Sequence, residues 1–208
     1  MTKIDPWFLQ QIKILSTYHI DASLKELKYN GFSDKQIGRI VGKTEMEIRD
    51  QRKDESVHPS FKVVDTCAAE FEAVTPYYYS TYEEENEAMP LKGAKAVVLG
   101  SGPIRIGQGI EFDYCSVHAS RALTEVGIAS IMINSNPETV STDFDSSSRL
   151  YFEPLDDESV MDVLENERND EGCPPVVVQF GGQTAINLSQ SLDQNGYQIL
   201  GSSAATID

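Results

Sequence analysis

The sequence predicts an all-helical N-terminal part followed by a small α/β domain with a parallel sheet. Two observations predict this combined α and α/β fold class. Residues 1–56 carry short apolar stripes at helical spacing, with capping residues between them. Residues 93–208 instead alternate short apolar runs with helical patterns. That alternation is typical of a Rossmann-like parallel sheet with right-handed crossovers and helices on both faces.

The helices of the first part are predicted mainly from their ends. Asp5-Pro6 is a favourable start, because proline is already set for the first helical turn. Ser33–Gln36 and Thr44–Glu47 have the pattern of capping boxes, and each precedes an apolar stripe. We therefore expect several short helices within residues 1–56.

Residues 57–92 look irregular, with a tyrosine cluster followed by the acidic run Glu83–Glu87. Gly93, close after a proline, marks a boundary. We therefore expect a helical domain over residues 1–92 that ends in an irregular segment, and an α/β domain over residues 93–208.

The α/β domain is predicted to contain five strands and three helices. The expected strands are 96–99, 128–134, 150–152, 176–180 and 197–200, and the expected helices lie near 111–126, 157–168 and 183–194. The polar or glycine-rich segments 100–109, 134–143 and 179–184 follow three of these strands. Because the carboxyl ends of parallel strands meet at one edge of a sheet, these segments predict one shared site there.

The first of these segments is a glycine-rich loop with Gly100 and Gly102 at its start. It is not a dinucleotide fingerprint, because the third glycine of that pattern falls on Arg105 and the next strand ends in Asn134-Ser135-Asn136 instead of an acid. The loop contains no Gly-Lys-Ser or Gly-Lys-Thr, so it is not a P-loop, and Gly42-Lys43-Thr44 of the helical part lacks the earlier glycine of that motif, whose position is Ile37. Two interpretations stay open: the loop lines a polar site, or its glycines only permit tight strand-to-helix packing.

Several motifs together resemble the large subunit of carbamoyl-phosphate synthase. They are residues 100–115 (GSGPIRIGQGIEFDYC), 136–143 (NPETVSTD), 179–184 (QFGGQT), 65–71 (DTCAAEF), 79–85 (YSTYEEE) and 4–9 (IDPWFL). They follow the order of that family and extend over essentially the whole chain. One departure is the tail Gly201–Thr206, which lacks the proline expected after the family's Gly-x-Ser.

The resemblance implies a fold and an activity. Residues 1–92 resemble the oligomerisation domain between the two synthetase halves, and residues 93–208 resemble the pre-ATP-grasp domain that opens the second half. The family is an ATP-dependent ligase that makes carbamoyl phosphate from bicarbonate, ammonia (from glutamine) and two ATP, for arginine and pyrimidine biosynthesis. Its partners are a glutaminase small subunit and further copies of itself, and the full-length enzyme uses MgATP and potassium.

The same resemblance implies which residues line a site. Positions matching Gly109, Glu111 and Glu138 line the family's carbamate tunnel, where glycine leaves the bore open and carboxylates can hydrogen-bond the carbamate amino group. Glu111 has a second interpretation as a first-turn helix acid that the dipole stabilises. Further candidates for lining the site are Gly100, Gly102, Arg105, Asn136, Thr139, Gly181, Gly182 and Gln183.

Within this set, Arg105 either pairs with Glu111 or Asp113 or reaches substrate. The segment 179–184 either supplies amide donors at a helix start or only packs the loop. The chain appears truncated before the ATP-grasp fold, so we expect no catalytic residue, no bound cofactor and no activity from this part alone.

Composition excludes several other classes. The net charge is −16, and residues 93–208 hold five Lys and Arg against seventeen Asp and Glu, so the surface repels nucleic acid and anionic membranes. The three cysteines and three histidines lack metal-ligand spacing. No apolar run approaches membrane-spanning length and no signal peptide is present, so we expect a cytoplasmic chain without a metal site.

An alternative function is a non-enzymatic regulator. The segment Ser33–Lys53 contains two short capped helices joined near Gly42 and carries a local charge of +2, like a helix-turn-helix. The α/β domain would then sense a small molecule. The weak basic patch and the acidic remainder argue against DNA binding.

Overall fold

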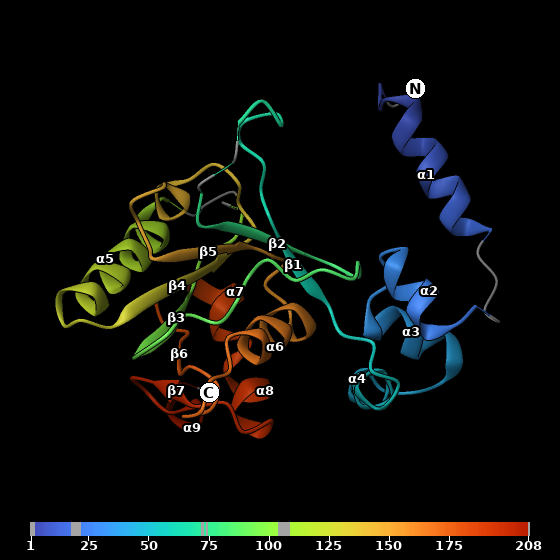
Figure 1. The fold of residues 1–208 in the computed structure, drawn as a ribbon. Helices are drawn as coiled ribbons and strands as arrows, with labels where there is room; N and C mark the ends of the chain where they lie inside the picture. Colours follow the sequence, from blue (N-terminus) through green and yellow to red (C-terminus); the bar gives the residue numbers. More distant parts are fainter. Residues whose placement is uncertain (1–2, 18–21, 72, 74, 104–108, 208) are drawn as a thin grey trace. The chain divides into compact units, whose positions relative to one another are not determined.

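The computed structural model describes residues 3–17, 22–71, 73, 75–103 and 109–207 (Figure 1). The chain divides into two compact units, Met1–Pro59 and Ser60–Asp208, here called the helical unit and the sheet unit. The expected order, helices first and a parallel sheet second, is confirmed.

The helical unit contains α1 (Pro6–Ser16), α2 (Leu24–Tyr29), α3 (Asp34–Val41) and α4 (Glu45–Asp54). Asp5 caps α1 by accepting a hydrogen bond from the Trp7 N–H at 2.8 Å. The two predicted capping boxes start α3 and α4, and a third at Ser23 starts α2.

The core of the helical unit is small and combines apolar packing with a buried ion network. Its apolar residues are Leu24, Leu27, Ile37 and Ile48, with Ala22 and Phe32 packed against them. Asp34 is fully buried and forms ion pairs with Lys28 and Arg52, each at 3.0 Å. One carboxylate therefore ties α2, α3 and α4 together.

This arrangement weakens the helix-turn-helix interpretation. Arg49 and Arg52 contribute two of the positive charges of the segment, yet their side chains are buried, at 2% and 1% exposure. A buried guanidinium that is tied to Asp34 is not available to a phosphate backbone.

The sheet unit is built on a seven-stranded sheet of order β1-β2-β5-β4-β3-β6-β7. The strands are β1 (Ser60–Val63), β2 (Tyr77–Thr81), β3 (Lys95–Leu99), β4 (Ala129–Asn134), β5 (Arg149–Phe152), β6 (Val176–Val177) and β7 (Ile199–Leu200). The helices are α5 (Glu111–Glu125), η1 (Val140–Thr142), α6 (Asp157–Asn166), α7 (Gly182–Ile186), α8 (Ser189–Gln194) and α9 (Ala204–Ile207). Among the strands that the structure describes, only the pairing of β1 with β2 is antiparallel.

The expectation of an irregular segment over residues 57–92 is wrong. Its tyrosine cluster forms β2, which pairs in parallel with β5, and β1 pairs antiparallel with β2. Tyr77 explains the pairing, because its ring meets the Phe152 ring edge-on at 5.5 Å and its hydroxyl donates to the Thr142 carbonyl at 3.1 Å. Both strands belong to the sheet unit.

The helix expected at 183–194 is divided into α7 and α8. Asn187 ends α7, and its N–H bonds to the carbonyls of Gln183 and Ala185. Asparagine has a low helix propensity, and its own side chain accepts a hydrogen bond from Gln183 at 2.6 Å.

A row of apolar side chains in register forms the core on one face of the sheet. Val98 lies opposite Met132 and Val177, and Met132 lies opposite Leu150. Ala119 and Leu123 of α5 pack against this row. The right-handed crossovers place α5 on this face and α6 on the other (Figure 1).

The direction of chain progression reverses within this sheet. From β3 the chain moves through β4 to β5 on one side, and β6 and β7 then follow on the other side of β3. The topological switch point therefore lies between β3 and β6. Open α/β sheets bind ligands at such a point, outside the carboxyl ends of the strands.

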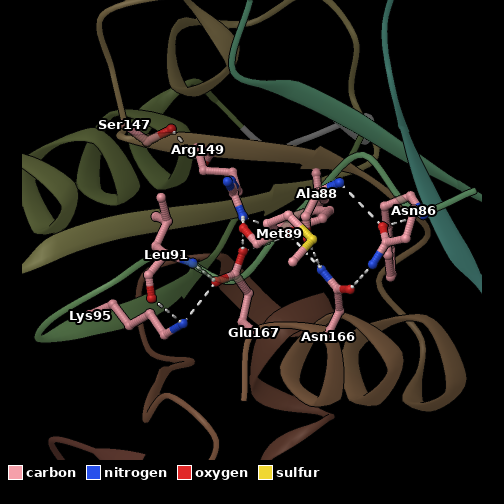
Figure 2. Close-up of polar contacts among 11 residues, drawn as sticks. Asn86, Ala88, Met89, Leu91, Lys95, Ser147, Arg149, Asn166 and Glu167 are labelled. Carbon is pink, nitrogen blue, oxygen red and sulfur yellow. Dashed lines mark hydrogen bonds and ion pairs between the residues drawn. The ribbon is translucent and has the colours of Figure 1, made fainter. Parts of the chain in front are cut away.

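The amino edge of the sheet is held by a buried carboxylate, Glu167, at the end of α6 (Figure 2). It accepts hydrogen bonds from Lys95 Nζ at 3.0 Å, the Leu91 N–H at 3.0 Å, Arg149 Nη1 at 2.5 Å and the Tyr151 hydroxyl at 2.6 Å. Burial opposes ionisation, but the Tyr151 hydrogen bond and the Arg149 charge outweigh it and lower the pKa of Glu167.

Replacing this carboxylate should test how strongly the cluster stabilises the sheet unit. Glu167→Gln leaves the Lys95 and Arg149 charges buried without their counter-charge, so we expect unfolding free energy to fall by about 3–5 kcal/mol. Urea unfolding followed by circular dichroism measures this loss. Glu165→Gln, in a partly exposed pair with Arg168, is the control and should cost about 1 kcal/mol or less. Equal losses for the two variants would contradict the role given to Glu167.

A second buried carboxylate, Glu153, holds β2 at the opposite edge. It is 4% exposed and accepts hydrogen bonds from the Ser80 N–H and, at 2.9 Å, from the Ser80 hydroxyl. Burial raises the pKa of Glu153 from 4.5 to about 7, the Ser80 hydrogen bonds oppose the rise, and Asp162 and Asp156 add to it.

This raised pKa predicts a pH dependence of stability. A carboxyl with a higher pKa in the folded state stabilises fully below pH 4.5, and that contribution is lost as pH rises through about 7. Glu153→Gln mimics the neutral acid. Its unfolding free energy relative to wild type should therefore rise by up to about 3 kcal/mol between pH 5 and pH 8.

Urea unfolding at several pH values measures the effect, and Glu125→Gln, at an exposed carboxylate on α5, controls for net charge. A variant whose stability follows pH in parallel with wild type would show that Glu153 does not titrate in this range.

Candidate functional site

The loops after β3, β4 and β6 meet at the carboxyl edge of the sheet, as the sequence predicts. Their glycines explain how closely they approach. A Cβ at Gly181 would collide with the Gly100 carbonyl and lie 2.6 Å from the Leu99 carbonyl. Gly182 has a φ of +66°, and a Cβ there would lie 3.2 Å from the Phe112 ring. These glycines allow the β3 and β6 loops to touch at the switch point.

The β3 loop also packs against the loop after β4. A Cβ at Gly100 would lie 2.6 Å from the Asn134 side chain. The Gly102 N–H donates to Asn134 Oδ1 at 3.0 Å, and the Asn136 N–H donates to the same oxygen at 3.1 Å. Gly102 has a φ of +69°, and a Cβ there would lie 3.2 Å from Ser135 Oγ. For Gly100, Gly102, Gly181 and Gly182, the structure thus gives a conformational or packing reason that is sufficient by itself.

Asp113 fixes the other end of the β4 loop. It lies in the first turn of α5, is 1% exposed, and accepts hydrogen bonds from Thr139 Oγ1 at 2.7 Å, the Ser141 N–H at 2.9 Å and Ser141 Oγ at 2.5 Å. Ser141 Oγ in turn accepts from Asn134 Nδ2 at 2.8 Å. We call Gly102, Asp113, Asn134, Thr139 and Ser141 the edge network.

Most of this network was not among the predicted site residues. Asp113 was considered only as a partner for Arg105, and Asn134 and Ser141 were not chosen. The available signal was an acid near a helix start, followed after the next strand by asparagine and a Thr-x-Ser sequence. Nothing in the sequence shows that these groups face one another across 28 positions.

The predicted tunnel residues lie on the exposed side of this network. Glu111 opens α5 and is exposed, and a Cβ on the neighbouring Gly109 would collide with its carboxylate. Glu138 is also exposed, and its N–H donates to Asn136 Oδ1 at 3.1 Å. No hydrogen bond recorded among the described residues joins Glu138 to Glu111.

The remaining predicted residues have varied positions. Arg105 and its expected pairing lie outside the described residues. Asn136 and Thr139 are half-buried, and both hold the β4 loop. Gln183 is exposed, but its amide donates to Asn187 within α7, so this side chain is used inside its own helix.

The surroundings of the edge are acidic and apolar. Between Gly109 and Ser148 the sequence has no lysine and a single arginine, Arg121. Ile110, Phe112 and Tyr114 lie beside Glu111 and are 53%, 39% and 52% exposed. Carboxylates beside such side chains can accept hydrogen bonds from a small amine or amide, whereas they repel a polyphosphate.

Other features of the described residues do not suggest a different site. No group of three or more His, Cys, Asp or Glu among them could hold a metal ion. Within the same residues, no helix has the length and apolar character needed to span a membrane. The three cysteines are free. A cavity of about 170 Å³ lies at the amino ends of β3, β6 and β7, beside Gly93, Pro175 and Gln198, away from the three loops.

Comparison with known proteins agrees with both units. Residues 1–56 match the family model described as the carbamoyl-phosphate synthetase large chain oligomerisation domain, and residues 92–208 match the carbamoyl phosphate synthase preATP-grasp domain.

Curated relatives match the whole chain. The carbamoyl phosphate synthase large chain of Thermomicrobium roseum is 55% identical and that of Archaeoglobus fulgidus is 51% identical, each over 100% of this chain and 20% of the relative. The protein of the same name from Rhodopirellula baltica is 52% identical with the same coverage. This chain spans about a fifth of the length of these relatives. Since one family model alone covers more than half of the residues, the chain belongs to the carbamoyl phosphate synthase large-chain family.

Proposed function

We propose that this chain serves the synthesis of carbamoyl phosphate from bicarbonate, ammonia and two ATP, as one part of a large subunit in the cytoplasm. The observation that carries the proposal is the agreement between whole-chain similarity and three loops that meet at the switch point. The sheet unit forms a wall of the site that phosphorylates carbamate and of the passage that leads there. The helical unit contributes to self-association, and a glutaminase small subunit supplies the ammonia.

The chemistry of the exposed edge supports a role towards carbamate. Carbamate carries an amino group at one end and a carboxylate at the other. Glu111 and Glu138 accept hydrogen bonds from the amino group and repel the carboxylate, so they favour one orientation. In the reaction, a carbamate oxygen attacks the γ-phosphorus of ATP and the bond to ADP breaks, which gives carbamoyl phosphate.

The same edge does not fit ATP itself. The described residues that would have to hold a triphosphate are carboxylates and amides, and the sequence from Gly100 to Ser148 has two arginines and no lysine: Arg105 in the glycine-rich loop and Arg121 in α5. MgATP and potassium therefore act elsewhere in the full-length subunit, and this part contributes no ligand to them.

Self-association has support from α1. The helix contains no buried residue, and Trp7, Phe8 and Ile12 are 62%, 58% and 61% exposed. A helix that exposes a broad apolar face is stable when another surface covers that face.

Narrowing the passage tests the proposed role of the sheet unit. In the full-length enzyme, Gly109→Val places a side chain where the Glu111 carboxylate now lies. We expect bicarbonate-dependent ATP hydrolysis to survive, whereas carbamoyl phosphate output falls by about tenfold or more. Coupled assays of both rates measure this, with Ala122→Val on the exposed surface of α5 as the control. If Gly109→Val changes neither rate, the tunnel assignment is wrong.

Titration of the isolated chain tests the predicted lack of a nucleotide site. Calorimetry with MgATP should show no saturable heat, because the described part of the edge presents carboxylates and no cluster of basic groups. The full-length subunit, titrated under the same conditions, is the positive control. Saturable binding by the 208-residue chain would mean that the glycine-rich loop holds nucleotide.

A further inference from the structure

We propose that Asp113 is a positioning residue that holds the Glu138 loop against the glycine-rich loop, so that its loss lets carbamate escape before phosphorylation. This inference rests on the proposed function, because it assumes that Glu138 lines the carbamate passage. It adds a group that lies behind the passage wall and does not touch the substrate.

The first argument is the set of contacts that Asp113 makes. All three of its recorded hydrogen bonds come from residues 139 and 141 of the β4 loop, and none of them comes from its own helix. The side chain is 1% exposed. Hydrogen bonds to a carboxylate that is shielded from water are strong and directional. Asp113 therefore fixes this loop relative to the start of α5.

The second argument is continuity. From Asp113 the network passes through Ser141 Oγ to Asn134 Nδ2, and from Asn134 Oδ1 to the Gly102 N–H. It thus joins the start of α5, the β4 loop and the glycine-rich loop. The two ends of the predicted passage wall share one hydrogen-bonded support.

The third argument is the position of Glu138 within this support. On one side, its N–H is bound by Asn136, whose own N–H is bound by Asn134. On the other side, the next residue, Thr139, is bound by Asp113. The loop from 134 to 139 is therefore held by hydrogen bonds at both ends, and the exposed Glu138 carboxylate lies between these two points. Such preorganisation is what a site requires of its supporting residues.

A readout is needed that separates positioning from general stability. A variant with less folded enzyme loses ATP consumption and carbamoyl phosphate formation by the same factor, so their ratio is unchanged. A displaced Glu138 instead lets carbamate escape and take up a proton, which yields ammonia and carbon dioxide after one ATP has been spent. ATP consumed per carbamoyl phosphate then rises above the two that the reaction requires.

The experiment measures this ratio in the full-length enzyme. Asp113→Asn keeps the shape of the side chain but removes its charge, and its NH₂ group replaces one of the two oxygens that accept hydrogen bonds from Thr139 and Ser141. We expect the ratio of ATP consumed to carbamoyl phosphate formed to rise several-fold. Thr139→Val removes one of the three hydrogen bonds and should raise the ratio less, which keeps the test valid if Asp113→Asn fails to fold.

A matched control exists on the same helix. Ser120 is fully buried in α5, and its hydroxyl bonds to Ser130 Oγ at 2.7 Å and to the Ser146 carbonyl at 2.5 Å. Ser120→Ala removes buried hydrogen bonds between α5 and the β4 region without touching residues 134–139. It should lower stability and leave the ratio at its wild-type value.

Glu138→Gln and the double variant identify the path of the effect. If Asp113 acts through Glu138, adding Glu138→Gln to Asp113→Asn should raise the ratio little further. Two results would overturn the inference and leave the proposed function intact. One is that the effects of Asp113→Asn and Glu138→Gln on the ratio are fully additive. The other is that Glu138→Gln raises the ratio while Asp113→Asn and Thr139→Val both leave it at the wild-type value. If Gly109→Val and Glu138→Gln also leave the ratio unchanged, the proposed function itself fails.

Discussion

The sheet unit depends on how it compensates one buried charge, that of Glu167. Its carboxylate accepts hydrogen bonds from Lys95 in β3, Arg149 and Tyr151 in β5, and the Leu91 N–H of the preceding linker (Figure 2). Removing the Glu167 carboxylate or one of its cations leaves a buried charge without its counter-charge. The free-energy cost of that unpaired charge is far larger than the net stabilisation that the intact cluster provides. The cluster therefore fixes strand register at the amino edge, and the loops at the carboxyl edge are free to be shaped by function.

Three buried acids of this unit, Asp113, Glu153 and Glu167, show how the surroundings determine what a carboxylate does. Glu167 faces two cations, and its pKa is lowered. Glu153 is bound only by Ser80 and lies near two further acids, so burial dominates and its pKa is raised to about 7. Asp113 is bound by hydroxyl and amide donors of a single loop, which suits a group whose task is to hold that loop in place.

Local signals predicted much of the fold, whereas contacts between distant residues were not predictable. The capping boxes at Ser33 and Thr44 and the alternation of strands and helices after residue 93 depend on neighbours in sequence, so they were found. The strand Tyr77–Thr81 was missed although one partner, β1, is near in sequence. Its other partner, β5, which joins it to the main sheet, lies more than 70 residues away, and strand propensity depends on such packing. The pairing of Asp113 with Ser141 was missed for the same reason, although the loops themselves were predicted.

The reason for having glycine differs from one position to another at the carboxyl edge, and this difference bears on function. No other residue fits at position 181, because a Cβ there would collide with the backbone carbonyls of Leu99 and Gly100. A Cβ at Gly100 would collide with the Asn134 side chain. Gly109 is exposed, and among the described residues the atoms nearest to a Cβ there belong to the flexible end of Glu111. A side chain that can rotate away does not force glycine on the fold, since its displacement costs little. Packing therefore accounts for Gly100 and Gly181, whereas for Gly109 we propose a functional reason, an open passage beside Glu111.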